Sequence, residues 1–138
     1  MIIDTDVLIW YIKGNEKAYK AIKMANNFFI SVVTYIELVQ GMRNKKELNS
    51  LRKSIHSWDA KVLYISEEIS SKAMFYVEQH FLSHSLQLAD ALIGATAVAY
   101  GLSILTGNNK ERGRNNFPNY ASQLQATFAR SQITKISK

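Results

Sequence analysis

Residues 1–10 read MIIDTDVLIW, and they contain the first strand, the first acids and the start of the first helix that the sequence predicts. Its three apolar residues predict a short buried strand, and the carboxylates of Asp4 and Asp6 interrupt the apolar run directly afterwards. From Asp6 the apolar spacing suits a short helix that ends near Gly14. A strand that leads through acidic residues into a helix is the first unit of an α/β fold.

The rest of the chain continues this alternation. Buried strands are predicted at residues 1–3, 28–33, 61–65 and 102–106. Helices are predicted at residues 15–27, 34–41, 48–58, 66–77 and 85–101. The sequence therefore predicts a three-layer α/β/α fold around a central, mostly parallel sheet of four to five strands.

The segment after Thr106 is rich in Asn, Arg and Ser and has weaker periodicity. A short edge strand or helix near residues 124–128 is compatible with it, and residues 125–138 read as a loose basic tail. We expect residues 1–138 to form a single domain, which is an ordinary size for one hydrophobic core.

Composition narrows the class of protein. The chain is 47% hydrophobic and 20% charged, which is typical of a globular domain. It has no cysteine, which excludes disulfides and thiolate metal sites and fits a reducing compartment. No apolar run approaches the ~20 residues of a membrane span, and aspartates interrupt the N-terminal apolar stretch where a signal peptide would need continuity. We therefore expect a cytoplasmic protein that does not enter a membrane.

Acidic and polar residues follow the predicted strands. Asp4 ends the first strand, Glu37 comes after the second, and Thr106 and Asn108 come at the end of the fourth, while Asp90 falls in the first turns of the long apolar helix. In a parallel sheet these positions converge on one edge. Three carboxylates there would repel one another unless a cation compensates them, and oxygen ligands favour magnesium (Mg²⁺) or manganese (Mn²⁺).

Each acid also has a structural interpretation. Asp4 or Asp6 can cap the first helix, because Asp is a favoured N-cap residue. Glu37 can belong to a capping box with Thr34. Asp90 is harder to explain in this way, since an unpaired carboxylate in an apolar helix is costly.

The order of these motifs resembles the PIN-domain family and, within it, the VapC-like toxins of bacterial toxin–antitoxin pairs. The resemblance covers residues 1 to about 109. Its three motifs are MIIDTDVLIWYI, ISVVTYIELVQG and LSHSLQLADALIGATAVAYGLSILTGN.

The resemblance implies a metal-dependent endoribonuclease that hydrolyses RNA, is usually a homodimer and is held inactive by an antitoxin. It implies Asp4, Glu37 and Asp90 as catalytic acids and Mg²⁺ ligands, with Asp4 and Asp90 the principal ones. Asp6 would support this loop. The same resemblance gives Thr106 and Asn108 supporting roles.

The chain departs from the family at the fourth acid. The stretch TGNNKER places Glu111 at that position, so Glu111 is the fourth catalytic candidate. A rival alignment on NNFPNY leaves Asn116 near the site instead. Because the fourth acid differs, the sequence does not decide whether the site binds one metal ion or two.

Two other functions remain open at this stage. The Asp4-x-Asp6 opening also fits haloacid-dehalogenase-type phosphatases, with Asp4 as nucleophile and Asp6 as general acid. That chemistry needs a late acidic pair for Mg²⁺, whereas the sequence has one late acid on a predicted helix, Asp90, and no convincing pair. A catalytically impaired PIN-like module that binds RNA or a protein is the other alternative.

The binding surfaces are predicted less specifically. The net charge of +6 favours a polyanion such as RNA. Basic residues around the 48–58 helix would either steer RNA or form a solvated face; they are Arg43, Lys45, Lys46, Arg52 and Lys53. An antitoxin groove would be walled by Trp10, Tyr11 and the apolar stripe of residues 48–58, for which core packing is the alternative.

Overall fold

The computed structural model describes residues 1–82, 86–107 and 133–136. These residues form a five-stranded sheet in which every neighbouring pair is parallel, in the order β3-β2-β1-β4-β5. The strands are β1 (Ile2–Ile3), β2 (Phe29–Ser31), β3 (Lys61–Leu63), β4 (Ile104–Gly107) and β5 (Ile133–Ile136). The predicted parallel sheet is thereby confirmed.

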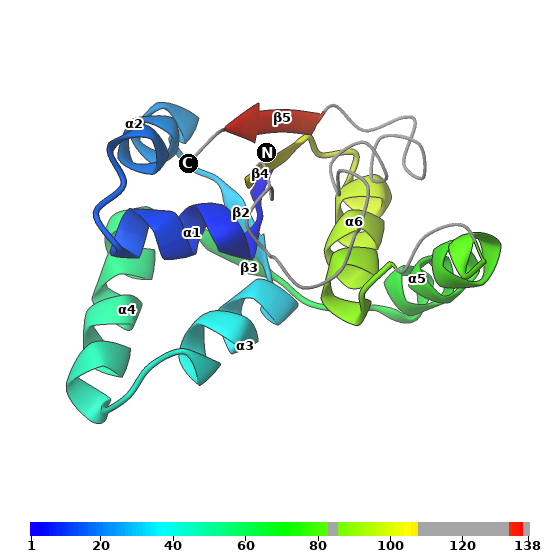
Figure 1. Cartoon of the computed structure of the whole chain (residues 1–138), viewed down its shortest axis with the longest axis horizontal. Coiled ribbons are helices and arrows are strands. Elements are labelled where there is room, and N and C mark those ends of the chain that lie inside the picture. Colours follow the sequence, from blue (N-terminus) through cyan, green and yellow to red (C-terminus); the bar gives the residue numbers. More distant parts are fainter. Residues whose placement is uncertain (83–85, 108–132, 137–138) are drawn as a thin grey trace.

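Helices cover both faces of this sheet, as Figure 1 shows. They are α1 (Thr5–Ile12), α2 (Glu16–Ala25), α3 (Val32–Gln40), α4 (Lys45–Ser57), α5 (Glu67–His80) and α6 (Leu88–Tyr100). The helices α1, α2 and α4 pack on one face and α6 packs on the other, with α5 outside α6. The predicted three-layer α/β/α architecture is confirmed. None of the helices in the described part has the length and apolar character that a bilayer crossing requires.

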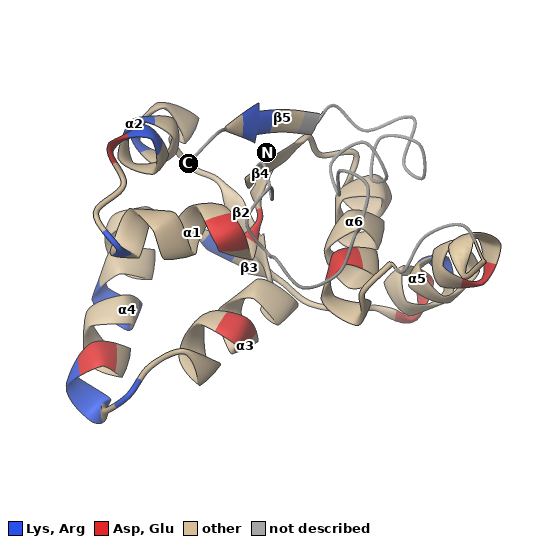
Figure 2. Ribbon diagram, viewed as in Figure 1, with Lys and Arg blue, Asp and Glu red and all other residues tan. Residues whose placement is uncertain are grey.

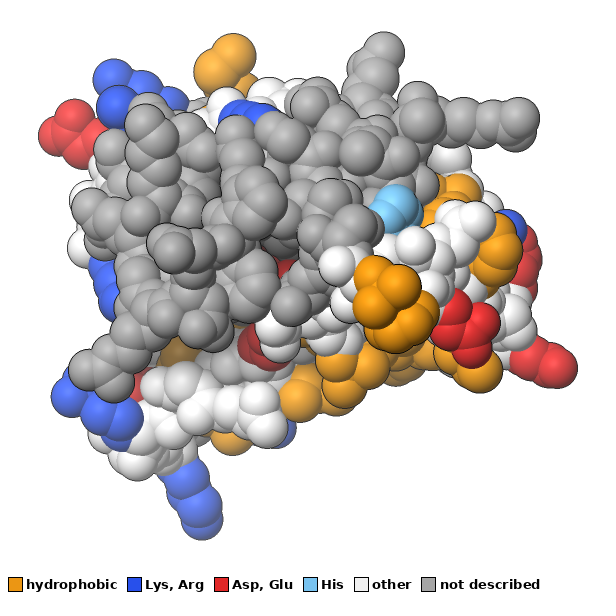
Figure 3. All heavy atoms as spheres, turned by 45° about the vertical axis from the view of Figure 1, so that its right-hand side comes forward, with side chains coloured by type: hydrophobic (Ala, Val, Ile, Leu, Met, Phe, Trp, Pro, Cys, Tyr) orange, Lys and Arg blue, Asp and Glu red, His pale blue; other side chains and the backbone are white. Residues whose placement is uncertain are grey.

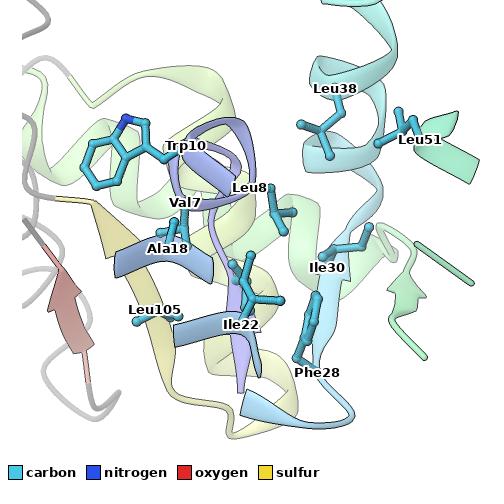
Figure 4. Packing of buried hydrophobic residues seen from close by; sticks show 11 residues of the cluster. Val7, Leu8, Trp10, Ala18, Ile22, Phe28, Ile30, Leu38, Leu51 and Leu105 are labelled. Atoms are coloured by element: carbon cyan, nitrogen blue, oxygen red, sulfur yellow. The ribbon is translucent and has the colours of Figure 1, made fainter. Parts of the chain in front are cut away.

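Alternation along the strands divides the interior into two cores. Ile3 and Leu105 are paired in register and face the larger core, shown in Figure 4. Ile2 and Ile104 are also paired, and they face α6 in a smaller core on the opposite side of the sheet. Neighbouring residues on a strand point to opposite faces, so each central strand supplies both cores.

Polar side chains set most helix starts. The side chains of Asn15, Asn44 and Ser66 accept hydrogen bonds from amides in the first turns of α2, α4 and α5. At the other end of α6, Gly101 adopts a left-handed conformation with φ of 62° and ends the helix as the sequence predicts.

Two segment assignments from the sequence were wrong. The strand predicted at residues 28–33 ends at Ser31, because the Ser31 hydroxyl accepts a hydrogen bond from the Val33 amide and starts α3. The predicted loose tail does not hold for Ile133–Ile136, which pairs with β4 as an edge strand. The expected element at 124–128 lies outside the described residues.

Trp10 and Gly107 make a close contact where α1 passes over the end of β4. Trp10 is 9% exposed and belongs to the larger core, so it is not the groove wall that the sequence suggested. A Cβ atom placed at Gly107 would lie 2.5 Å from Cη2 and 2.9 Å from Cζ3 of the Trp10 ring. The absence of a side chain at Gly107 therefore makes room for the indole.

We expect Gly107→Ala to lower the free energy of unfolding by about 1–3 kcal/mol, as overpacking of a filled core does. Urea denaturation followed by tryptophan fluorescence measures this. Gly41→Ala is the matched control, because a Cβ there would meet nothing closer than 3.4 Å. Equal unfolding midpoints for the two variants would contradict the contact.

Candidate active site

Asp4 is held at the carboxyl end of β1 by three hydrogen bonds. Its amide donates to the Leu105 carbonyl at 2.9 Å, which extends the pairing of β1 with β4. Its Oδ1 accepts from the Thr5 amide at 2.7 Å, and its Oδ2 accepts from the Thr106 hydroxyl at 2.7 Å. Asp4 is therefore the N-cap of α1, and the capping interpretation of this residue is confirmed together with its place at the sheet edge.

The Asp4 carboxyl sits in an environment that disfavours its charge. Burial raises its pKa from 3.8 to about 7, and the negative charge of Asp6 adds to the increase. Asp90 acts in the same direction, whereas the hydrogen bonds from Thr106 and Thr5 lower the pKa. Asp4 is only 4% exposed, so water does little to relieve this unfavourable charge.

Acidic residues from separate elements converge on this point. Asp6 lies in the first turn of α1 and is 8% exposed, and Asp90 lies in the first turn of α6. Both are near enough for their charges to raise the pKa of Asp4. Figure 2 shows acidic segments of α1, α3 and α6 around the carboxyl end of the sheet. The fold thus brings Asp90, from a much later part of the sequence, near Asp4 and Asp6.

Glu37 joins the site through a threonine of α1. The Thr5 hydroxyl donates to Glu37 Oε2 at 2.5 Å, and the Thr5 and Thr34 hydroxyl oxygens are 3.2 Å apart. The predicted capping box was wrong, because α3 begins at Val32 and Thr34 lies inside the helix. Glu37 is instead held by a residue of the first motif.

Sequence reasoning did not single out Thr5 as a functional residue. It is 3% exposed, although it directly follows an acid in an apolar run. A buried hydroxyl at that position needs a partner, and this was the available signal. Its partners Thr34 and Glu37 are about thirty residues away, which local spacing does not reveal.

The donor set is consistent with a divalent cation. Carboxylates that repel one another in a buried setting are stabilised by a cation, and a bound ion would lower the pKa of Asp4. Among the described residues, no three carboxylate or histidine side chains form a ready-made metal-binding group. Mg²⁺ commonly binds through one or two carboxylates and keeps several waters, so the Asp4 neighbourhood fits such an ion.

Thr106 lies beside Asp4 as the sequence predicted, since its hydroxyl bonds to the carboxylate. The other two candidates of that segment, Asn108 and Glu111, lie outside the described residues, as does the rival Asn116. Their roles stay predictions.

Comparison with known proteins adds independent information. The model of the PIN domain family matches residues 1–113. A search of curated proteins finds no matching relative.

Solved structures with the same fold include several toxin–antitoxin complexes. A toxin–antitoxin complex from Klebsiella pneumoniae is 26% identical, with 83% of this chain and 92% of that chain covered and a TM-score of 0.65. VapBC-1 from nontypeable Haemophilus influenzae is 17% identical, with 97% and 96% covered and a TM-score of 0.71. VapBC2 from Rickettsia felis, bound to a promoter DNA fragment, is 18% identical over 97% and 96%, with a TM-score of 0.68.

The raised pKa of Asp4 predicts how stability depends on pH. Because the folded state holds this proton up to about pH 7 and the unfolded state releases it near 3.8, the contribution to stability is full below pH 3.8 and declines as the pH rises to about 7. We expect Asp4→Asn, which has no charge to bury, to be more stable than the wild type at pH 8, by up to roughly 4 kcal/mol in the absence of metal. The advantage should shrink towards pH 5.

Urea denaturation of EDTA-treated protein between pH 5 and pH 8 measures this difference. Glu47→Gln is the control, because hydrogen bonds from the Arg43 amide and guanidinium lower the pKa of the Glu47 carboxyl. It should gain no stability towards pH 8. If the difference in unfolding free energy between Asp4→Asn and the wild type stays constant across this range, the pKa of Asp4 is not raised by folding.

Proposed function

Because the chain belongs to the PIN domain family, we propose that it is a metal-dependent endoribonuclease and the toxin of a toxin–antitoxin pair. The observation that carries this proposal is the Asp4 carboxyl at the carboxyl edge of a parallel sheet, whose pKa is raised first by burial and further by the charges of Asp6 and Asp90. A buried cluster of acids is unfavourable for packing alone, whereas it suits the binding of a cation and of a phosphodiester beside that cation.

In this proposal Asp4, Glu37 and Asp90 would hold Mg²⁺ or Mn²⁺, and Glu111 is the candidate fourth acid. The ion would activate a water and stabilise the attacking and leaving oxygens of the displacement. The match with the PIN domain family over residues 1–113 supports a nuclease over the phosphatase alternative.

The chain's own residues prepare this site before substrate binds. Thr106 and the Thr5 amide hold both oxygens of Asp4, which restricts its rotation. Asp4 and Asp6 lie at the N-terminus of α1 and Asp90 at that of α6, where the helix dipole favours a negative charge. The helices thus offset part of the repulsion between acids.

RNA is the proposed substrate, and the basic surface supports it. The chain has 17 Lys and Arg against 11 Asp and Glu. Figure 2 shows the basic residues gathered along α2 and α4, apart from the acidic edge. A strand of RNA whose phosphates follow this surface could present one phosphodiester to the acids.

An antitoxin is the proposed protein partner, because similar structures are toxin–antitoxin complexes. We propose that it binds near the acids and delivers an arginine to them, since a carboxylate cluster suits bidentate pairing. Tyr11 and Trp58 are half-buried against the larger core, with ring centroids 5.0 Å apart in an edge-to-face contact, and we propose that their exposed parts belong to the groove wall. We place both proteins in the cytoplasm.

A second copy of the chain is the proposed partner of the apolar face beside α5. Figure 3 shows apolar side chains gathered on this side of the molecule. The exposed apolar residues of α5 and its flanks are Met74, Phe75, Phe81, Leu82 and Leu88, with exposed fractions between 53% and 88%. Contiguous apolar surface of this kind marks interaction sites.

We expect the purified protein to cleave a mixed RNA pool with Mg²⁺ or Mn²⁺ and to lose this activity in EDTA. Asp90→Asn should lower the cleavage rate by at least about 100-fold, as loss of a catalytic group does. Gel-resolved cleavage of labelled RNA measures the rate. The matched control is Asp59→Asn, the same substitution at an exposed position with φ of 49°, which Asn tolerates.

Two outcomes would contradict this function, and a third would contradict the role of Asp90. Absence of cleavage with either ion would favour the non-catalytic binding module. Phosphate release from a small monoester would favour the phosphatase. If Asp90→Asn cleaves RNA at the wild-type rate, Asp90 is not a catalytic residue.

We expect the protein to sediment as a dimer and Phe75→Glu to sediment as a monomer, because a buried unpaired charge is costly. Analytical ultracentrifugation at micromolar concentration measures the mass. Met24→Glu is the control, since Met24 is 85% exposed on α2, on the other side of the sheet. A dimer that survives Phe75→Glu would place the interface elsewhere.

A further inference from the structure

Thr5 is the point where two of the proposed acids meet. Its amide donates to Asp4 Oδ1 at 2.7 Å and its hydroxyl donates to Glu37 Oε2 at 2.5 Å. One residue thus bonds to acids that lie on two different motifs. Both donor–acceptor distances lie within the range of a hydrogen bond.

Thr34 supports this bridge from α3. Its oxygen lies 3.2 Å from the Thr5 hydroxyl oxygen, and its side chain is fully buried. A hydroxyl has one proton to donate, so when Thr5 donates to Glu37 the Thr34 hydroxyl donates to Thr5. The resulting chain from Thr34 through Thr5 to Glu37 is directional, and each bond polarises the next.

The bridge also restricts how Glu37 can act. A glutamate in the middle of a helix has several rotamers, and a hydrogen bond to one carboxylate oxygen selects among them. The hydrogen bond from the Thr5 hydroxyl takes one acceptor position on Oε2, and the other lone pairs of the carboxylate can bind a cation without breaking the bridge. Thr5 is buried at 3% exposure, so water does not readily replace it.

We propose that Thr5 is a positioning residue that sets Glu37 relative to Asp4 and thereby raises the affinity of the site for a divalent cation. This inference rests on the proposed function, in which Asp4 and Glu37 are cation ligands. Residues that bond to ligands in this way typically change metal affinity by 10–100-fold when they are removed.

The test measures Mn²⁺ binding by isothermal titration calorimetry, independently of RNA cleavage. Thr5→Val keeps the shape of the side chain and removes the hydroxyl, and it should weaken Mn²⁺ binding by roughly 10–100-fold. Thr5→Ser restores the hydroxyl and should bind Mn²⁺ close to the wild-type affinity. Thr96→Val is the matched control, because this buried hydroxyl donates to the Leu92 carbonyl inside α6.

A double-mutant cycle separates positioning from a general structural effect. If Thr5 acts through Glu37, then Thr5→Val should cost no further Mn²⁺ affinity in a Glu37→Gln background. Thr5→Ala repeats the measurement if Thr5→Val does not fold, as judged by circular dichroism. At a Mn²⁺ concentration below saturation, RNA cleavage by Thr5→Val should show a lower kcat with an unchanged KM for RNA, because fewer molecules hold the ion while the RNA contacts are the same.

The outcomes distinguish this inference from the proposed function. If the wild type binds no Mn²⁺, the metal dependence itself fails and takes the inference with it. If the wild type binds Mn²⁺ and Thr5→Val binds it equally well, the positioning role alone is wrong. An equal loss in the Glu37→Gln background would also overturn it, because Thr5 would then act on the fold rather than on Glu37.

Discussion

The structure is organised around Asp4, whose carboxyl is buried where β1, α1 and β4 meet. Its backbone continues the pairing of β1 with β4, and its carboxylate caps α1 and accepts from Thr106. Asp4 therefore connects β1, α1 and β4, and it also lies at the centre of the acidic site. Because Asp4 has this many partners, a change that shifts its carboxylate also disturbs the fold. A change in the surrounding fold likewise shifts the carboxylate in the site.

Local chemistry explains why part of this site was predictable. The role of Asp4 follows from its place between an apolar strand and a helix, and both can be recognised within ten residues of sequence. Parallel strands then imply that acids from later motifs meet it. The partner of Glu37 was not predictable, because Thr5 lies 32 residues away and the capping box offered a closer alternative for Glu37.

The ends of the strands, like the contacts of the site, depend partly on local sequence and partly on residues far away in the chain. The stretch FFISVV has strand propensity throughout, yet its three-residue strand ends at Ser31, whose hydroxyl accepts a hydrogen bond from the Val33 amide and starts a helix. The edge strand Ile133–Ile136 has little apolar periodicity, and its pairing with β4 across the sheet defines it. Propensity alone gives the order of the elements up to β4, misses β5, and places the ends of the elements poorly.

The two-residue strand β1 has a consequence for how precisely the chain must assemble. Ile2 and Ile3 belong to separate cores on opposite faces of the sheet. A slip of one residue along β4 would exchange these two side chains between cores of different shape, and would carry Asp4 about 3.3 Å away from its threonine. Correct packing of Ile2 and Ile3 in their two cores therefore fixes the register of β1 against β4. The same register sets the position of the Asp4 carboxylate.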